Sequence, residues 1–468
     1  MTDRIQTAYS EAEARYVAAN SASRAAHETA TASLPGGNTR SVLHWEPYPL
    51  YIISAEGYTL RDADGHTYVD LLGEYSAGIY GHSHPVLLAA ITETAQRGLS
   101  YGGPHAAEAR LAMLIKDRFR SIERVRFTNS GTEANLMALA AAKAFTGRYR
   151  GKIIVFDGAY HGGVLLFPLG CKDIWGAKEE AERASKYKVL RALNAPHDFL
   201  VATYNDIASV DALIESVPGC LDNIAAILLE PMLGSGGGVC ATPEFLSHLR
   251  HRADELGALL IFDEVMTSRM YAGGGIQSEL DVRPDLTTLG KYIGGGMSFG
   301  AFGGREDVMA LFDPRAPGAL PHAGTFNNNV LTMNVGATGL ERVFTPEKAR
   351  ELHDLGDEVR DRINGLGDDA PGPGKKRLRV LGCGSILVFH FTGTSIENIA
   401  SPADWKADED PRLLDLFHLE MLHEGFYLAR RGYVALNLAL LEQDGRGELD
   451  RFVNAVQRFV VKFRDLVE

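Results

Sequence analysis

The chain has 468 residues, of which 45% are hydrophobic and 23% charged, a composition typical of a globular protein with one large domain and one smaller domain. Its 47 Lys and Arg and 60 Asp and Glu leave a formal net charge of -13, which repels phosphate backbones and argues against a nucleic-acid partner. The four cysteines form no C-x-x-C pair and predict reduced thiols in a cytoplasmic protein, without a disulfide framework or a metal site. Because no apolar run reaches about 18 residues, we expect no membrane span.

The N-terminal part of the chain predicts a helix followed by a hairpin. Alanine alternates with charged residues over roughly the first 30 positions, which predicts one amphipathic helix on the surface or against a partner subunit. The stretch 50–70 then predicts two strands around an Asp-Gly turn.

The middle of the chain has a different pattern. Four short apolar runs are each followed by a turn and then by a helical pattern: RVRFTNSG, GKIIVFDGAY, IAAILLEP and ALLIFDEV. Strands separated by helices in this way predict an α/β fold with a mostly parallel sheet. Helices expected near 346–364, 409–424 and 448–467 would belong to a smaller α+β domain, and polar inserts at about 172–197 and 365–377 are expected on the surface.

Two segments that follow predicted strands are rich in small and polar residues. The first, NSGTEAN at 129–135, opens a helical pattern, where free N–H groups and the hydroxyls of Ser130 and Thr132 could bind a phosphate. A capping box without any ligand would use the same residues. The second, Tyr160-His161-Gly162-Gly163, suits an aromatic ring that stacks on a flat ligand, or a simple packed pair.

Two charged residues follow apolar runs further along the chain. Asp263 comes after ALLIF at the inner end of a predicted buried strand, where it could hold a protonated ring nitrogen, or serve as a structural ion pair or helix cap. Val265, two residues later, would point to the same face. Lys291 lies between an apolar run and the glycine-rich GGGMSFGAFGG, where burial would favour the neutral, nucleophilic amine; taken alone, it could equally be structural.

These four features form a set. A phosphate cradle, a stacking aromatic ring, a carboxylate for a protonated pyridine and a poised lysine are the parts that pyridoxal 5'-phosphate (PLP) requires, and they occur in that order along the chain. Each alone is a weak signal, but together they predict a PLP enzyme.

The sequence resembles the class III (omega) aminotransferases of PLP fold type I, in the branch that contains β-amino-acid (β-phenylalanine type) aminotransferases and glutamate-1-semialdehyde aminomutase. The motifs that carry the resemblance run through most of the chain: Leu34–Arg40, Asp62–Asp70, Gly81-His82-Ser83-His84-Pro85, NSGTEAN, Tyr160-His161-Gly162, Glu230-Pro231, FDEVMT, Asp285–Gly296 and Gly324-Thr325-Phe326. The resemblance implies a large domain with a mostly parallel seven-stranded sheet and a smaller α+β domain. It implies an N-terminal segment 1–75 for the small domain and dimer contacts, a PLP-binding domain 76–335 and a C-terminal small domain 336–468.

Site roles carry over from the family position by position. The resemblance implies that Lys291 binds the cofactor as a Schiff base and moves the proton, that Asp263 binds the pyridine nitrogen, and that Tyr160 and Val265 flank the ring. It further implies phosphate contacts from Ser130, Gly131 and Thr132, supporting positions for His161 and Glu230, and a homodimer in which Thr325 reaches the cofactor of the neighbouring subunit. For His82 and His84 it implies a structural role rather than a metal site.

The resemblance implies that two arginines take part in substrate recognition. Arg40 matches a position that in this branch binds a substrate carboxylate, and a guanidinium does so with a bidentate fork. In the pair Arg430-Arg431 at most one side chain can point inward, and Arg431 is the better match; surface charges are the alternative for these arginines.

The sequence departs from the aminomutases at three places: Asn327–Val330 after GTF, Ser268-Arg269-Met270 after FDEVMT, and LARRGY near the C-terminus. We therefore expect a ping-pong aminotransferase that moves an amino group from a β-amino acid, which can be aromatic, to a 2-oxo acid. The alternatives are the aminomutase, a broad amine transaminase, and a non-catalytic PLP-fold binding protein, against which the intact Lys291 and Asp263 argue.

Overall fold

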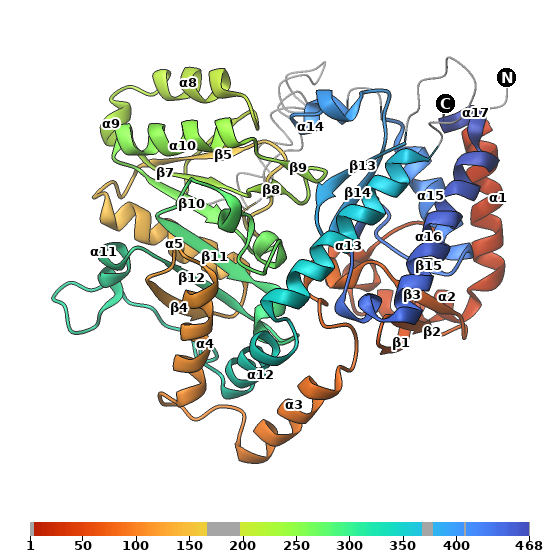
Figure 1. Cartoon of the computed structure of the whole chain (residues 1–468), viewed down its shortest axis with the longest axis horizontal. Coiled ribbons are helices and arrows are strands. Elements are labelled where there is room, and N and C mark those ends of the chain that lie inside the picture. Colours follow the sequence, from red (N-terminus) through yellow and green to blue (C-terminus); the bar gives the residue numbers. More distant parts are fainter. Residues whose placement is uncertain (1–3, 166–196, 367–377, 407–408, 468) are drawn as a thin grey trace.

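The computed structural model describes residues 4–165, 197–366, 378–406 and 409–467 (Figure 1). A large sheet with its helices occupies one side of the molecule, and the four-stranded and three-stranded sheets lie toward the other side, which holds both ends of the chain (Figure 1). The two predicted surface inserts fall almost wholly outside the described residues.

The large sheet has seven strands in the order β4-β12-β11-β10-β7-β5-β6. All neighbours pair in parallel except β12, which is antiparallel to both of its neighbours, so the predicted mostly parallel sheet is confirmed. The strands are β4 (Arg124–Thr128), β5 (Lys152–Phe156), β6 (Phe199–Ala202), β7 (Ile224–Leu229), β10 (Leu259–Asp263), β11 (Leu286–Gly290) and β12 (Gly300–Gly304).

Continuous apolar runs form the central strands because helices cover this sheet. Every residue of β7, β10 and β11 is buried. Helix α10 packs against β7 and β10, and α5 packs against β11 and β12. The helices in this half of the chain are α3 (Pro85–Arg97), α4 (Ala106–Arg118), α5 (Gly131–Phe145), α8 (Ile207–Glu215), α9 (Cys220–Asn223), α10 (Pro243–Leu256), α11 (Glu306–Met309) and α12 (Val330–Arg342).

The predicted hairpin around the Asp-Gly turn is confirmed by the stretch 50–70, but a third strand precedes it. The chain turns first at Gly57, whose φ of 55° is costly for other residues, and again at the predicted Asp-Gly turn. The strands are β1 (Ile52–Glu56), β2 (Thr59–Asp62) and β3 (Thr67–Asp70). β15 (Phe426–Tyr427) pairs in parallel with β3, which joins the N-terminal segment to the C-terminal one and supports the domain division that we propose from the sequence.

The N-terminal helix is interrupted, which corrects the single helix predicted there. α1 (Arg4–Ala19) and α2 (Ser21–Thr31) are separated by Asn20, whose side-chain Nδ2 donates to the Tyr16 carbonyl at 2.8 Å. α1 packs against α15 (Pro411–His423) of its own chain, with Tyr16 almost fully buried.

The C-terminal helices form close to where they are predicted. α13 (Pro346–Gly365) and α15 both begin with proline behind a side-chain cap, Thr345 and Asp410. The last predicted helix is split into α16 (Gln443–Lys462) and α17 (Arg464–Val467). The remaining elements are the three-stranded sheet of β13 (Leu378–Cys383), β14 (Ile386–Phe391) and β16 (Tyr433–Ala435), the hairpin of β8 (Met232–Leu233) and β9 (Val239–Cys240), and α14 (Pro402–Lys406).

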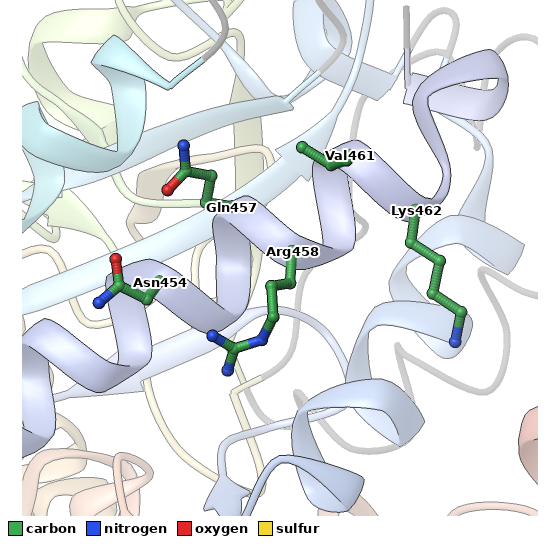
Figure 2. Close-up of a pocket in the computed structure, with 5 residues that line it drawn as sticks. All are labelled: Asn454, Gln457, Arg458, Val461 and Lys462. Carbon is green, nitrogen blue, oxygen red and sulfur yellow. The ribbon is translucent and has the colours of Figure 1, made fainter.

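A hollow on the outer face of α16 contains none of the predicted site residues (Figure 2). It is lined by Asn454, Gln457, Arg458, Val461 and Lys462. The two basic side chains that line it form ion pairs within the chain, Arg458 with Glu424 and Lys462 with Glu420. Among the described helices, none is both long and apolar enough to cross a membrane.

Candidate active site

The predicted site residues follow the carboxyl ends of five strands of the large sheet. Ser130 follows β4, Tyr160 follows β5, Glu230 follows β7, Asp263 ends β10 and Lys291 follows β11. Because these strands run in the same direction, their carboxyl ends lie at one edge of the sheet, where ligands bind in open α/β folds. The topology therefore brings together residues that are up to 161 positions apart, from 130 to 291.

The N-terminus of α5 forms a compact loop at this edge. Ser130 caps the helix, its Oγ accepting the Glu133 N–H at 3.1 Å, so the predicted capping is present. The first N–H groups of the helix, which precede its internal hydrogen bonds, still face the end of the helix. A Cβ on Gly131 would lie 2.8 Å from the Val265 methyl groups, which shows why only glycine fits between the loop and Val265. The Thr132 hydroxyl accepts the Gly163 N–H at 3.2 Å, which ties the loop to the segment after β5.

Asp263 lies in a network of hydrogen bonds and is only 3% exposed. Its Oδ2 accepts from Asn135 Nδ2 at 2.7 Å and contacts His161 Nδ1 at 2.8 Å. The Thr288 hydroxyl donates to Asn135 Oδ1 at 2.6 Å, and this bond orients the amide so that its NH₂ group faces Asp263. Asp263 therefore has a structural partner, as the alternative interpretation expected, and is also fixed in direction at the edge where the other site residues lie.

Lys291 occupies a constrained position at the start of the glycine-rich turn. Its φ is 56°, in the left-handed region that residues with a Cβ rarely adopt. Its Nζ donates to the Tyr75 carbonyl and the Ser76 hydroxyl, both at 2.6 Å. Burial lowers the pKa of this amine to about 7, opposed by the nearby Glu230 and Asp263 carboxylates.

This lowered pKa leads to a prediction for the protein without cofactor. As pH rises through about 7, Lys291 should lose its proton and become reactive, whereas an ordinary lysine amine does so near 10.4. Competitive acylation with acetic anhydride across pH 5–11, read by peptide mass spectrometry, measures this titration directly. If Lys291 titrated together with the bulk of the lysines, burial would not be controlling its amine.

Glu230 supports the segment that carries Tyr160. Its Oε2 accepts the Tyr160 N–H at 2.9 Å, and its Oε1 accepts the Gly234 N–H at 3.2 Å. Burial raises the pKa of Glu230 to about 7. The Tyr160 side chain itself is 47% exposed, so its ring faces open space at the site.

Both predicted substrate arginines contact the same aromatic ring. The Arg40 and Arg431 guanidinium carbons each lie 5.4 Å from the centroid of the Tyr75 ring. Arg431 also donates to Ser235 Oγ at 3.3 Å, and Arg40 forms a 3.4 Å ion pair with Glu74. The charges of both arginines act on Tyr160, which places them at the same site.

Arg430 takes a different direction from its neighbour. Its guanidinium forms an ion pair with Asp415 on α15, with one N···O distance of 2.7 Å. Arg430 thus pairs with Asp415, whereas Arg431 lies at the Tyr75 ring.

His82 and His84 have separate partners. His82 Nε2 lies 2.8 Å from Asp70 Oδ2, and His84 Nδ1 accepts the Val86 N–H at the start of α3. Within the described residues, no group of three or more candidate ligands gathers in a way that could hold a metal ion.

Thr325 lies in an exposed turn near the α5 loop of its own chain. Two residues further on, Asn327 Oδ1 accepts from Asn129 Nδ2 at 2.9 Å, immediately before Ser130. The turn also contains Phe326, which is 61% exposed.

The sequence interpretation missed the residues that accept hydrogen bonds from Lys291. Residues 74–76 all have positive φ, between 51° and 76°, and present the oxygens that accept from Lys291. Arg269 is 1% exposed and donates to the Ser76 carbonyl at 3.3 Å and to Ser385 Oγ at 2.9 Å. Because burial lowers the pKa of Arg269 only to about 10, it remains a buried cation that holds this turn in place.

The residues gathered at this edge of the sheet fit PLP. An anion-binding helix N-terminus, a directed buried carboxylate and an amine with a pKa of about 7 are what the phosphate, the pyridine nitrogen and the aldehyde of this cofactor require. Together with the sheet topology, they define a PLP-dependent aminotransferase of fold type I.

Comparisons with known proteins agree with this class. Residues 43–432 match the family model for class III aminotransferases. The chain is 46% identical to the β-phenylalanine transaminase of Variovorax paradoxus over 97% of this chain and 96% of that protein. The chain belongs to the class III aminotransferase family, and its cofactor is PLP.

Solved structures show the same relationship. The β-phenylalanine aminotransferase of Variovorax paradoxus superposes with a TM-score of 0.88 at 45% identity, with 99% of each chain covered. A transaminase solved with PLP bound has a TM-score of 0.77 at 28% identity, covering 95% of this chain and 99% of that one. The glutamate-1-semialdehyde aminomutase of Pseudomonas aeruginosa has a TM-score of 0.81 at 20% identity, covering 97% of each chain, and shares the fold.

Proposed function

We propose that this aminotransferase moves the amino group of a β-amino acid, including aromatic ones, to a 2-oxo acid such as 2-oxoglutarate or pyruvate by a ping-pong mechanism. The observation that carries the proposal is that Arg40 and Arg431 both contact the ring of Tyr75, whose carbonyl accepts from Lys291. Two cations allow two different carboxylates to be bound in turn. The likeness to the Variovorax paradoxus enzyme, which is named for β-phenylalanine, supports the choice of donor.

The roles of the residues that hold the cofactor follow from their positions. Ser130, Gly131 and Thr132 would hold the phosphate at the N-terminus of α5, and Tyr160 and Val265 would flank the ring. When bound, PLP supplies an electron sink for the charge that develops on the substrate carbon. Asp263 binds the ring nitrogen, and its contacts with His161 and Asn135 keep its carboxylate in position.

Lys291 is the group that binds the cofactor and moves the proton. Its pKa of about 7 means that a large share of the amine is neutral near neutral pH, as both a nucleophile and a base require. Tyr75, whose ring both arginines contact, and Ser76 accept hydrogen bonds from Nζ and hold it in place. Glu230 accepts the Tyr160 N–H and so supports the segment that carries this ring.

The aminomutase and a broad amine transaminase are the alternative functions. A panel of amines with and without a 2-oxo acid separates the three, because a mutase needs no acceptor and a broad amine transaminase needs no carboxylate on the donor. We expect turnover of β-amino acids only when the acceptor is present. Isomerisation of a single substrate, or equal rates with amines that lack a carboxylate, would overturn the proposal.

The two arginines are expected to serve different half-reactions. A β-amino acid carries its carboxylate one carbon further from the reacting nitrogen than a 2-oxo acid does. We expect Arg40→Ala to lower kcat/KM of the amine half-reaction and Arg431→Ala that of the oxo-acid half-reaction. Each loss should be ~30- to 1000-fold, from the roughly 2–4 kcal/mol of a charge-assisted contact.

Single-turnover absorbance spectra follow each half-reaction separately. Arg430→Ala is the matched control, since it removes the adjacent guanidinium that is paired with Asp415 instead. Equal losses in both half-reactions for both variants would contradict the division. Unchanged rates in Arg40→Ala would favour the broad amine transaminase.

We propose that the enzyme is a cytoplasmic homodimer with shared active sites, in which Thr325 contacts the phosphate of the partner's cofactor. Three large apolar side chains support an interface near this turn, each more than half exposed in the single chain: Leu99, Tyr101 and Phe326. The Leu99 carbonyl accepts the Val330 N–H at 3.0 Å, so the two segments are adjacent. The cysteines that the structure describes, Cys220, Cys240 and Cys383, are free thiols, which supports a reducing compartment.

If the sites are shared, cofactor affinity should depend on protein concentration. Dilution into monomers should release PLP, and Thr325→Ala should weaken PLP binding in the dimer. Sedimentation at assay concentration, together with the absorbance of the bound cofactor, measures both. A fully active monomer would contradict shared sites.

A further inference from the structure

Two cysteines from distant parts of the chain meet beside the site. Cys240 ends β9 and Cys383 ends β13, and these strands pack against each other. A Cβ on Gly238 would lie 3.2 Å from the Gly382 backbone nitrogen, which shows how closely the two strands approach. Each thiol affects the pKa of the other, so the two side chains lie close together.

We propose that Cys240 and Cys383 are an oxidative modification site, at which a hydroperoxide such as hydrogen peroxide forms a reversible intrachain disulfide. Both cysteines are free thiols in the structure. Cys240 is exposed and Cys383 is partly exposed, so a small oxidant can reach the pair from solvent. Because β9 and β13 pack against each other, we expect the disulfide to close without unfolding.

The surroundings of the two thiols assign them different roles. The interaction with Cys240, followed by the nearby His353, lowers the pKa of Cys383 to about 7, while the same interaction raises the pKa of Cys240. The Tyr271 hydroxyl lies 3.9 Å from Cys383 Sγ and can donate to the thiolate. Cys383 is therefore the thiol that attacks the oxidant, and Cys240 is the one that resolves the product.

The oxidation of the two thiols to a disulfide needs only the peroxide as a co-reactant. The Cys383 thiolate attacks one peroxide oxygen, the O–O bond breaks, and a sulfenic acid and hydroxide form. The Cys240 sulfur then attacks the Cys383 sulfur, the S–O bond breaks and the S–S bond forms. The two thiol protons end in water, so two thiols and one peroxide give one disulfide and two waters.

The cross-link would act on the edge of the active site. The connection between β8 and β9 carries Gly234, which donates to Glu230, and Ser235, which accepts from Arg431. The disulfide would tie the end of this hairpin to β13. Oxidation would thus restrain the segment that contacts Arg431.

The test uses the PLP-loaded enzyme at pH 7 with a small excess of hydrogen peroxide, followed by alkylation, non-reducing digestion and mass spectrometry. We expect one cross-linked peptide pair that joins Cys240 to Cys383 and disappears with dithiothreitol. The pair should form roughly tenfold faster than an ordinary cysteine of pKa about 8.5 is oxidised, because about half of Cys383 is thiolate at this pH. Cys220 is the internal control and should remain alkylatable.

Two single variants separate the roles. In Cys240→Ser, Cys383 should stop at the sulfenic acid and be trapped by dimedone. In Cys383→Ser, Cys240 should stay a thiol. A missing cross-link, oxidation of Cys220 at the same rate, or unchanged Cys240 oxidation in Cys383→Ser would each overturn the proposal.

Discussion

Lys291→Ala is expected to remove the reducible covalent bond to PLP and essentially all turnover. The loss of proton transfer alone should cost 10²- to 10⁴-fold in rate, a typical range for general acid–base catalysis. The α5 loop and Asp263 are unchanged in this variant, so PLP should still bind without a covalent bond. Borohydride reduction followed by peptide mapping measures the covalent bond, and steady-state assays measure the rate.

Lys116→Ala is the control, because Lys116 is an exposed lysine in the last turn of α4. It should keep both the adduct and the activity. A borohydride-reducible adduct retained in Lys291→Ala would show that another amine binds the cofactor. Partial recovery of Lys291→Ala by a small added amine would confirm that the missing function is the amine itself.

Asp263→Asn is expected to lower kcat by on the order of 10²-fold or more while PLP remains bound. Asparagine keeps the size of the side chain but removes the charge that would hold a proton on the ring nitrogen, so electrostatic stabilisation of the transition state is lost. The contacts with His161 and Asn135 make the position rigid, so no other carboxylate can take its place without moving these residues.

The rate of each half-reaction and the absorbance of the bound cofactor should be measured together for this variant. Asp222→Asn, which neutralises an exposed carboxylate on α9, serves as the control for the loss of one charge. Near-normal kcat in Asp263→Asn with full cofactor occupancy would remove the role proposed for this carboxylate.

The positions of Asp263 and Lys291 could be predicted because each lies at the carboxyl end of a fully buried strand. A charged residue directly after a run such as ALLIF stands out in a single sequence, and parallel strands bring their carboxyl ends to one edge. Asn135 was also within reach of prediction, since it lies one helical turn after Gly131 and therefore on the same face of α5.

The partners of Lys291 could not be predicted in this way. Tyr75 and Ser76 reach Nζ only because they adopt positive φ values, and residues with a Cβ give no local signal for that conformation. Arg269 was noted only as a departure from the aminomutases, because tertiary packing alone decides whether an arginine is buried. The break at Asn20 is similar, since neither proline nor glycine marks it.

The central claim is that the nitrogen of a β-amino acid is transferred to a separate 2-oxo acid. The most direct measurement is to supply ¹⁵N-labelled 3-amino-3-phenylpropanoate with unlabelled 2-oxoglutarate and to determine by mass spectrometry where the label goes. We expect the label in newly formed glutamate, in equal amount to the 3-oxo acid produced, and no consumption of the donor when 2-oxoglutarate is omitted. Label that stays in an isomer of the donor, or glutamate that forms without label, would contradict the account.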